Sequence, residues 1–269
     1  MNPGVKVITR PAHAPLDNAD TYGGAACTEN MRIAIVSDIH GNRGALEAVE
    51  ADLRQTSPDL VLHGGDLADA GSSPVAVVDR LRELGWAGVG GNTDEMLFRP
   101  ESLIEFASQS PKMQPLLEVI AEMAAWTREL LGAERLAWLG ALPRVHPHPP
   151  IALVHASPES PWRAPAPEAS NLELESVYAQ LGLPVAAYGH IHQPYIRSTS
   201  KVVVANAGSV SLSYDGDRRA SYLLLDDARP TIRRVEYDVE REVKGLINSG
   251  MPHADWMVKI LRSGRPQMP

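Results

Sequence analysis

The chain has 269 residues, of which 44% are hydrophobic and 22% charged, a balance typical of a globular protein. The 25 Lys and Arg against 33 Asp and Glu leave a formal charge of −8, which disfavours binding to duplex nucleic acid because that affinity depends on clustered cations. The single cysteine, Cys27, excludes an internal disulfide framework. No apolar run reaches the roughly 18 residues that a membrane helix needs, so we expect a cytoplasmic protein with no membrane partner.

The first 30 residues are rich in Pro, Ala, Gly and Asn and carry no sustained hydrophobic period, so we interpret 1–30 as an N-terminal extension that need not be ordered. The β-branched run at 32–37 predicts a buried strand, and apolar residues on one face of 45–53 predict a helix after it. Strands at 59–63 and 86–89 and a helix over 75–84 continue a strand–helix–strand rhythm, which is typical of a parallel sheet.

Residues 95 to about 141 interrupt this rhythm with apolar helical stripes, which we interpret as a helical insert. His146 and His148 fall in a proline-rich stretch that we interpret as a linker. Further on, the pattern predicts strands at 151–154 and 185–188 with a helix over 172–181 between them. Antiparallel strands are expected next, at 195–198, 201–205, 220–225 and 231–237. Two surface helices follow, at 239–247 and 254–261. We therefore predict a domain over 31–238 with 239–269 as its C-terminal helical segment.

Five of the apolar strands end in residues whose side chains can ligate a metal ion. Ligands bind at the carboxyl ends of the strands in open α/β sheets, so we expect these groups to converge on one rim. Each alone has an ordinary structural explanation, as a turn residue, a helix cap or a hydrogen-bonded histidine. Their coincidence favours a site made of Asp38, His40, Asp66, Asn92, His155, His190 and His192.

The seven groups comprise three carboxylates or amides and four imidazoles, too many for one four-coordinate ion. A mixed set of this kind accepts Mn, Fe, Zn, Co or Ni. Two ions about 3.5–4 Å apart can bind a phosphoryl oxygen and lower the pKa of a bridging water. The residues therefore predict metal-assisted hydrolysis, with a phosphate ester as the substrate.

Five segments also resemble, in order and spacing, the sequence blocks of calcineurin-like metallophosphoesterases. They are Asp38–Asn42, Gly65–Asp69, Gly91–Asp94, Val154–Ser157 and Gly189–His192. The turn at 206–210 resembles the one that follows the last block in the small bacterial phosphodiesterase branch. This resemblance, which covers residues 31 to about 210, implies a four-layer α/β/β/α sandwich of two mixed sheets with flanking helices.

The resemblance further implies how the seven residues divide between two divalent ions. Asp38, His40 and His192 would hold one ion, and Asn92, His155 and His190 the other. Asp66 would bridge them. Mn is the expected metal, with Fe, Ni, Co or Zn as alternatives, and a metal-bound hydroxide would attack in line, so that no side-chain nucleophile is needed.

From this we expect a phosphodiesterase acting on a small phosphate ester or a nucleotide. Alternatives with the same fold are a phosphomonoesterase or protein phosphatase and a dinucleoside-polyphosphate hydrolase. A non-catalytic scaffold is the alternative from another class. The sequence does not predict an oligomeric state.

Many members of the family carry histidine directly after the asparagine of the third block, where this chain has Thr93. A threonine cannot donate a proton as an imidazolium does, so we hypothesise a bias toward leaving groups that need little acid help. Asp94 and His63 are further catalytic candidates, with a helix cap and a structural strand end as their alternatives. The candidate substrate contacts are Asn42, Arg43 and Asn92, with a solvated side chain as the alternative for Arg43.

Overall fold

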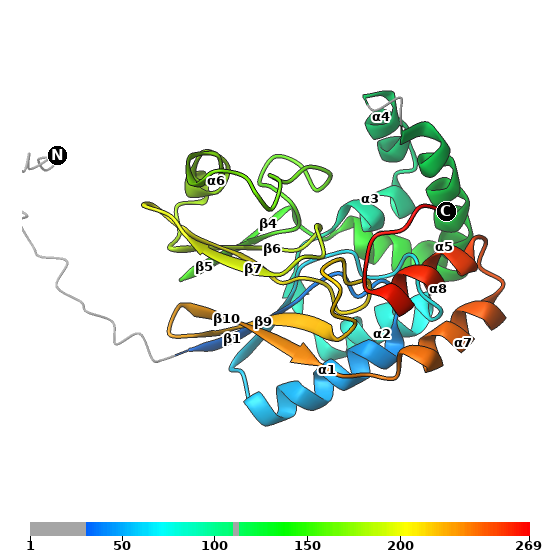
Figure 1. Ribbon diagram of the computed structural model, residues 1–269, viewed down its shortest axis with the longest axis horizontal. Helices are drawn as coiled ribbons and strands as arrows, with labels where there is room; N and C mark the ends of the chain where they lie inside the picture. Colours follow the sequence, from blue (N-terminus) through cyan, green and yellow to red (C-terminus); the bar gives the residue numbers. More distant parts are fainter. Residues whose placement is uncertain (1–30, 110–112) are drawn as a thin grey trace, which may run out of the picture.

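The computed structural model describes residues 31–109 and 113–269, so the extension expected over 1–30 lies outside the described residues. Two five-stranded sheets lie one over the other, and helices cover their outer faces and one end (Figure 1). The predicted α/β/β/α sandwich of two mixed sheets is therefore confirmed.

The first sheet contains the strand that opens the fold, β1, at its centre. Its order is β10 (Arg229–Val235), β9 (Ala220–Asp226), β1 (Arg32–Val36), β2 (Leu60–His63) and β3 (Ala87–Gly88). β1, β2 and β3 run parallel, whereas β9 runs antiparallel to both β1 and β10. The apolar run of β1 is buried on both faces, as expected for a central strand covered by helices on one side and a second sheet on the other.

The second sheet has the order β4 (Val145–His148), β5 (Ile151–Val154), β6 (Val185–Tyr188), β8 (Val203–Asn206) and β7 (Tyr195–Ser198). Two expectations need correction. β8 runs parallel to β6 and antiparallel only to β7. The linker prediction for His146 and His148 is wrong, because both lie in β4, antiparallel to β5. As an edge strand, β4 tolerates Pro147, which has no N–H to donate.

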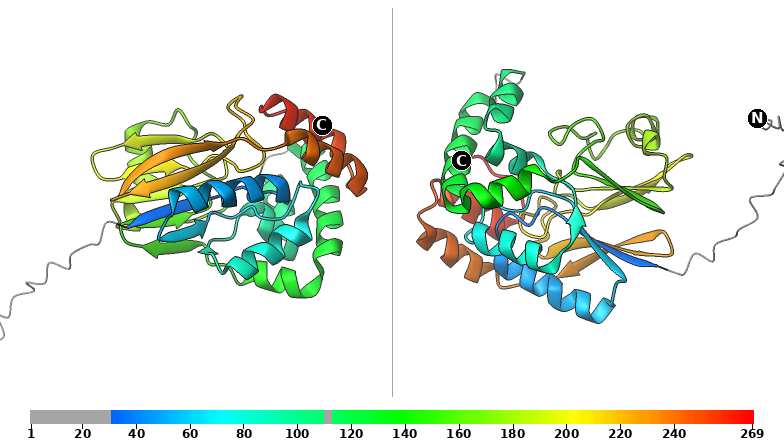
Figure 2. Two further views of the ribbon diagram at one scale, coloured as in Figure 1. Left: turned by 90° about the horizontal axis from the view of Figure 1, so that it is seen from below. Right: turned by 180° about the vertical axis from the view of Figure 1, so that it is seen from behind.

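Helices form the remaining layers and close one end of the sandwich. They are α1 (Arg43–Thr56), α2 (Pro74–Leu84), α3 (Asn92–Phe98), α4 (Glu101–Ser108), α5 (Gln114–Gly140), α6 (Asn171–Tyr178) with the short 3₁₀ turn η2 (Ala179–Leu181), α7 (Val239–Ser249) and α8 (Ala254–Ser263). Figures 1 and 2 show α1 outside the first sheet and α6 outside the second. The predicted helical insert corresponds to α3, α4 and α5.

Separate hydrophobic cores hold these layers together. Ile33, Ile35 and Leu153 lie between the two sheets. Leu46 and Val49 of α1 pack on the outer face of the first sheet, and apolar residues of α5, α7 and α8 pack on one another. None of the described helices is both long and apolar enough to cross a membrane.

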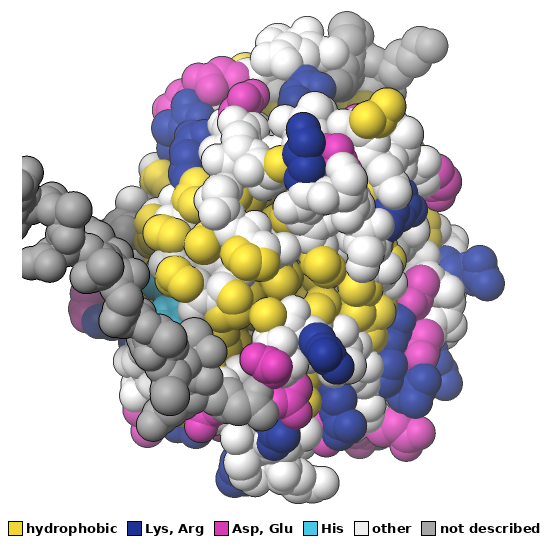
Figure 3. All heavy atoms as spheres, turned by 90° about the vertical axis from the view of Figure 1, so that its left-hand side faces the viewer, with side chains coloured by type: hydrophobic (Ala, Val, Ile, Leu, Met, Phe, Trp, Pro, Cys, Tyr) yellow, Lys and Arg dark blue, Asp and Glu magenta, His cyan; other side chains and the backbone are white. Residues whose placement is uncertain are grey.

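The two ends of the sandwich differ in chemistry. Figure 3 looks onto the end at which β1 begins, where hydrophobic side chains gather. The carboxyl ends of β1, β2, β3, β5 and β6 all lie toward the other end, because these strands run parallel within each sheet. The loops that follow them are the segments in which the sequence places its polar residues.

Candidate metal centre

All seven predicted ligands lie where a strand ends. Asp38 and His40 follow β1, and Asp66 follows β2. The remaining four follow β3, β5 and β6 and are Asn92, His155, His190 and His192. Five of the seven are buried, whereas Asn92 and His190 are partly exposed. These two side chains therefore mark the side from which solvent or a substrate reaches the cluster.

One group of ligand atoms comes from Asp38, His40, Asp66 and His192, all within 4.8 Å of one another. The Nε2 atom of His192 lies 3.0 Å from Oδ1 of Asp38 and 3.2 Å from Nε2 of His40. Nε2 of His40 lies 3.7 Å from Oδ2 of Asp66. Two carboxylates and two imidazoles thus face a common point, which makes this group a candidate metal site.

A second group contains Asp66 again, with His155 and His190. Nε2 of His155 lies 3.4 Å from Oδ1 of Asp66 and 3.0 Å from the Oδ1 atom of Asn92. Nδ1 of His190 lies 2.8 Å from the same Asn92 oxygen. Asp66 therefore belongs to both groups and turns a different oxygen toward each.

Backbone carbonyls orient three of the four imidazoles. Nδ1 of His40 lies 3.0 Å from the Asp69 carbonyl, Nδ1 of His155 lies 2.8 Å from that of Gly64, and Nδ1 of His192 lies 2.5 Å from that of Leu212. A carbonyl only accepts, so Nδ1 carries a proton in each ring, and in the neutral form of the ring Nε2 turns its lone pair inward. The facing Nε2 atoms of His40 and His192 then have no hydrogen between them, an arrangement that a cation stabilises.

The pKa values also point to strong fields inside the cluster. Burial alone would raise the pKa of Asp66, but the charge and hydrogen bond of His155 outweigh it and hold this pKa below its usual value. Burial would lower the pKa of His155, yet the Asp66 carboxylate raises it to about 9. Burial and the nearby charge of His155 lower the pKa of His190 to about 4. Buried carboxylates with partly neutral imidazoles suit a bound divalent ion.

The backbone of the ligand loops has an unusual conformation. Five of the seven residues have positive φ: Asp38, His40, Asp66, His190 and His192, with φ between 48° and 65°. Hydrogen bonds of 2.9 Å join the first two loops, from the Asp38 amide to the Gly65 carbonyl and from the His40 amide to the Asp66 carbonyl. Gly91 packs so closely that a Cβ there would lie 2.0 Å from Oδ1 of Asp66. Loop-to-loop contacts therefore hold the ligand backbone in place.

Asp94 caps α3, which was the structural alternative for this residue, and it also supports the Asp66 loop. Its carboxylate accepts hydrogen bonds from the amides of Gly91 (3.0 Å), Asp66 (2.8 Å) and Leu67 (2.9 Å). Burial, and next the charge of Asp66, raise the pKa of Asp94 to about 6. Both carboxylate oxygens of Asp94 accept hydrogen bonds from backbone amides, and a catalytic role for Asp94 stays a prediction.

The other candidates have local contacts of their own. His63 is fully buried and packs against Trp138. Asn42 caps α1 through the Ala45 amide and donates to Ser211. The guanidinium of Arg43 pairs with the carboxylates of Glu47 and Glu50. Substrate contacts by Asn42, Arg43 and Asn92 and a catalytic role for His63 stay predictions.

The sequence does not predict one contact that supports His40, a hydrogen bond from Thr127 to Asp69. Asp69, whose carbonyl accepts from His40, is buried, and its own carboxyl oxygen accepts from Oγ1 of Thr127 at 2.6 Å. Thr127 lies on α5, 58 residues away along the chain. Only the packing of the helical insert against the second loop reveals that this hydroxyl supports the centre.

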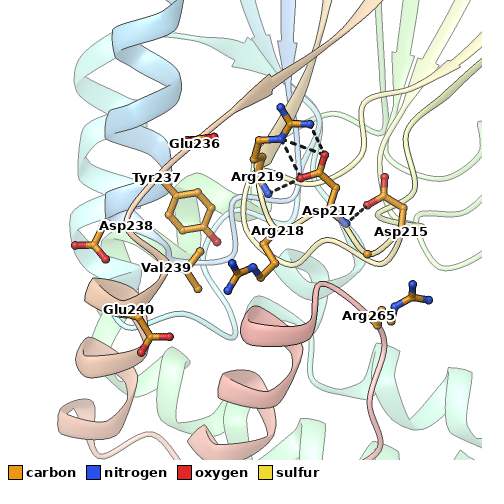
Figure 4. A pocket seen from close by; sticks show the side chains of 11 residues that line it. Asp215, Asp217, Arg218, Arg219, Glu236, Tyr237, Asp238, Val239, Glu240 and Arg265 are labelled. Atoms are coloured by element: carbon orange, nitrogen blue, oxygen red, sulfur yellow. Dashed lines mark hydrogen bonds and ion pairs between the residues drawn. The ribbon is translucent and has the colours of Figure 1, made fainter.

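A hollow of about 850 Å³ is lined by the segments 215–219 and 236–240 and by Arg265 (Figure 4). Its lining is rich in charge, and half of its ionic groups pair with neighbours, as Asp217 does with Arg219, Asp215 with Arg234 and Glu240 with Arg262. None of the seven predicted ligands lines it. The segments that line it carry no predicted ligand either, so the hollow is separate from the metal cluster.

A two-sheet sandwich with aspartates and histidines gathered at its strand ends is the architecture of a metal-dependent hydrolase. Residues 31–228 match the family model described as the calcineurin-like phosphoesterase superfamily domain, and the chain belongs to this family. The expected resemblance is confirmed. The family comprises phosphoric ester hydrolases that use divalent metal ions.

Several relatives cover nearly the same length. An uncharacterized protein of Methanocaldococcus jannaschii is 28% identical over 256 residues, which are 87% of this chain and 98% of the relative. A probable cyclic nucleotide phosphodiesterase of Synechococcus is 28% identical over 232 residues, which are 73% of this chain and 86% of the relative. The crystal structure of a metallophosphoesterase from Sphaerobacter thermophilus superposes with a TM-score of 0.71 at 26% identity, covering 88% of this chain and all of that one.

A hypothetical protein of Pyrococcus horikoshii has a similar fold, with a TM-score of 0.76 at 18% identity over 88% of this chain and 99% of the other.

Proposed function

We propose that the protein is a phosphodiesterase with a binuclear divalent metal centre. The observation that carries the proposal is the position of Asp66, whose Oδ2 faces His40 at 3.7 Å while its Oδ1 faces His155 at 3.4 Å. A carboxylate that presents one oxygen to each of two ligand groups is suited to bridge two ions. In this proposal Asp38, His40 and His192 complete one site, and Asn92, His155 and His190 the other.

When bound, two such ions bind the phosphoryl oxygens and supply a water of lowered pKa. The residues of the chain then hold the metal ligands in position. The carbonyls of Asp69, Gly64 and Leu212 fix the imidazoles of His40, His155 and His192. The three amides bound by Asp94 fix the loop of Asp66 and the start of α3, and thereby the Asn92 carboxamide. The partly exposed Asn92 and His190 leave one side open to an ester.

A diester substrate is favoured for two reasons. The Synechococcus relative is named a probable cyclic nucleotide phosphodiesterase. The residue after Asn92 is Thr93, which cannot deliver a proton to a poor leaving group. A small phosphate ester or nucleotide is the expected substrate, and Mn the expected metal.

The test compares hydrolysis of bis(p-nitrophenyl) phosphate with that of p-nitrophenyl phosphate. Metal-free protein is reloaded with Mn, Fe, Ni, Co, Zn or Mg in separate samples. We expect faster turnover of the diester, the highest rate with Mn, and a loss of at least a hundredfold in Asp66→Asn. The matched control is Asp227→Asn, which removes a carboxylate in the β9–β10 turn, far from the cluster along the chain.

The outcomes separate the alternatives. Preference for the monoester would replace the proposal with a phosphomonoesterase. Binding of metal without turnover of either ester would contradict the proposed activity and favour the scaffold. A stoichiometry of one ion per chain, measured by elemental analysis, would contradict the bridging role of Asp66.

A further inference from the structure

We infer that a small hollow, lined in part by the ligand-bearing helix α3 and by the loop that follows His155, is a subsite for a second anionic group of the substrate, such as a further phosphate. The inference rests on the proposed phosphodiesterase function and names the substrate class of the same site. The hollow has a volume of about 180 Å³. This is below the roughly 300–1,000 Å³ of a pocket for a whole ligand, so it suits one substituent of a larger substrate.

The walls of the hollow continue directly from ligand-bearing segments. One wall is α3, in which Glu95 lies about one helical turn after Asn92. Another is the loop that follows His155, which a Ser157–Ser160 turn folds back. There Trp162 donates from Nε1 to the Glu95 carboxylate at 2.7 Å. The hollow is therefore fixed to both Asn92 and His155.

Arginines in the lining are incompletely neutralised. The carboxylates of Glu95 and Glu105 are both bound by Arg99, at 2.8 and 2.9 Å. Arg144 reaches only the shared Glu95, at 3.5 Å. Arg163 has no carboxylate within ion-pair distance in the described part of the chain. It donates instead to the neutral Gln109 amide, and its guanidinium lies over the Phe106 ring. Three guanidiniums face two carboxylates, so the lining carries excess positive charge.

A buried hydroxyl adds a second, independent observation. Ser102 lines the hollow and is 2% exposed, and its Oγ has no hydrogen-bond partner among the described residues. A buried hydroxyl without a partner is unfavourable. An acceptor placed in the hollow would bind this donor. Donors in excess, on guanidiniums and a hydroxyl, select an oxyanion.

The experiment uses two chromogenic esters that differ in one group: thymidine 5′-(p-nitrophenyl phosphate) and the same ester with a 3′-phosphate. We expect the 3′-phosphate to lower KM about tenfold with little change in kcat, because a charge-assisted contact is formed in the ground state. Arg163→Gln and Arg144→Gln should each remove most of this difference. The matched control is Arg229→Gln at the exposed start of β10, which should retain it.

A binding measurement makes the inference independent of turnover. Calorimetry compares thymidine 3′,5′-bisphosphate with thymidine 5′-monophosphate, and the same tenfold preference is expected in Kd. Ser102→Ala should weaken bisphosphate binding without lowering Tm, because its hydroxyl has no partner to lose.

Each result decides one point. Equal KM and equal Kd for the paired ligands would overturn the subsite. A lower Tm in the arginine variants with the preference intact would also overturn it, because the arginines would then be structural. No turnover with any metal, together with a binding preference that Arg163→Gln abolishes, would defeat the proposed function and leave the subsite standing.

Discussion

A histidine buried without a hydrogen-bond partner is difficult to charge, and His63 is such a residue. It ends β2, is fully buried, and neither ring nitrogen has a partner in the described structure. Burial, and next the charge of His146, lower its pKa from 6.5 to about 4. The neutral ring is therefore part of the core beside Trp138.

This shift predicts an acid-side loss of stability. Above pH 6.5 the ring is neutral in both states. As the pH falls from 6.5 to about 4, the unfolded chain binds a proton that the folded chain does not, so the free energy of unfolding decreases by roughly 3 kcal/mol. Urea unfolding at pH 7.5, 5.5 and 4 should show a shallower decline for His63→Phe than for the wild type. Equal slopes in the two proteins would contradict the prediction, and His253→Gln, at a partly exposed histidine, controls for removal of a histidine.

Thr93 gives a prediction about leaving groups. Its amide donates to Oδ1 of Asp66 at 2.9 Å, and its Oγ1 is buried with no partner in the described residues. An imidazole at this position can protonate a departing alkoxide. We therefore expect Thr93→His to raise the rate with alkyl leaving groups about tenfold or more relative to p-nitrophenolate. A series of phosphodiesters of graded leaving-group pKa measures the ratio, and Thr93→Ser, which keeps the hydroxyl, should leave it unchanged.

At the scale of elements, α5 supports the metal cluster from the helical insert. Oγ1 of Thr127 donates to the Asp69 carboxyl, and the Asp69 carbonyl accepts from His40. Burial raises the pKa of Asp69 to about 7, so its charge depends strongly on the pH near neutrality. This hydrogen bond between side chains joins the helix to the ligand loop.

Removing that contact should affect both stability and metal binding. Thr127→Val leaves a buried carboxyl oxygen without its donor and should lower the free energy of unfolding by about 1–3 kcal/mol. Loss of a contact behind a ligand typically weakens metal affinity about tenfold or more. Titration of the metal-free protein with Mn measures the second effect. Thr127→Ser retains the hydroxyl and should behave like the wild type; if the serine and valine variants behave alike, the hydroxyl has no such role.

The sequence predicts the elements whose signals are local. The apolar run of β1 and the polar residues that follow five strands were enough to locate Asp38, Asp66 and His155 at one rim. The sequence does not predict β4, because His146 and Pro147 carry no strand signal and pair only through the distant β5. Nor does it predict the support from Thr127 or the saturation of the Asp94 carboxylate, because these depend on how distant segments pack.

At the scale of the whole molecule, the candidate centre joins the two sheets. Asp38 and Asp66 come from the first sheet, whereas His155, His190 and His192 come from the second. Without cations, like groups face one another at short range, as the two Nε2 atoms of His40 and His192 do at 3.2 Å. Bound ions should therefore stabilise the contact between the sheets.

We expect removal of metal to lower Tm. A ligand present at a hundred times its Kd stabilises a protein by about 2.7 kcal/mol, which corresponds to roughly 5–10 °C for a domain of this size. Differential scanning calorimetry with excess Mn and with EDTA measures the difference. Asp66→Asn should lose most of it. An identical Tm in both conditions, with Mn shown to be bound, would contradict a role for the ions in holding the sheets together.

Stability and metal binding make opposite demands on five of the ligand positions, which have positive φ: Asp38, His40, Asp66, His190 and His192. Most side chains pay about 1–2 kcal/mol for that backbone conformation, although aspartate and histidine adopt it more often than most residues. Glycine would relieve the strain at any of these positions while deleting a ligand. Descendants no longer under selection for hydrolysis are therefore expected to accumulate glycine at these positions, which yields a more stable but inactive protein of the same fold.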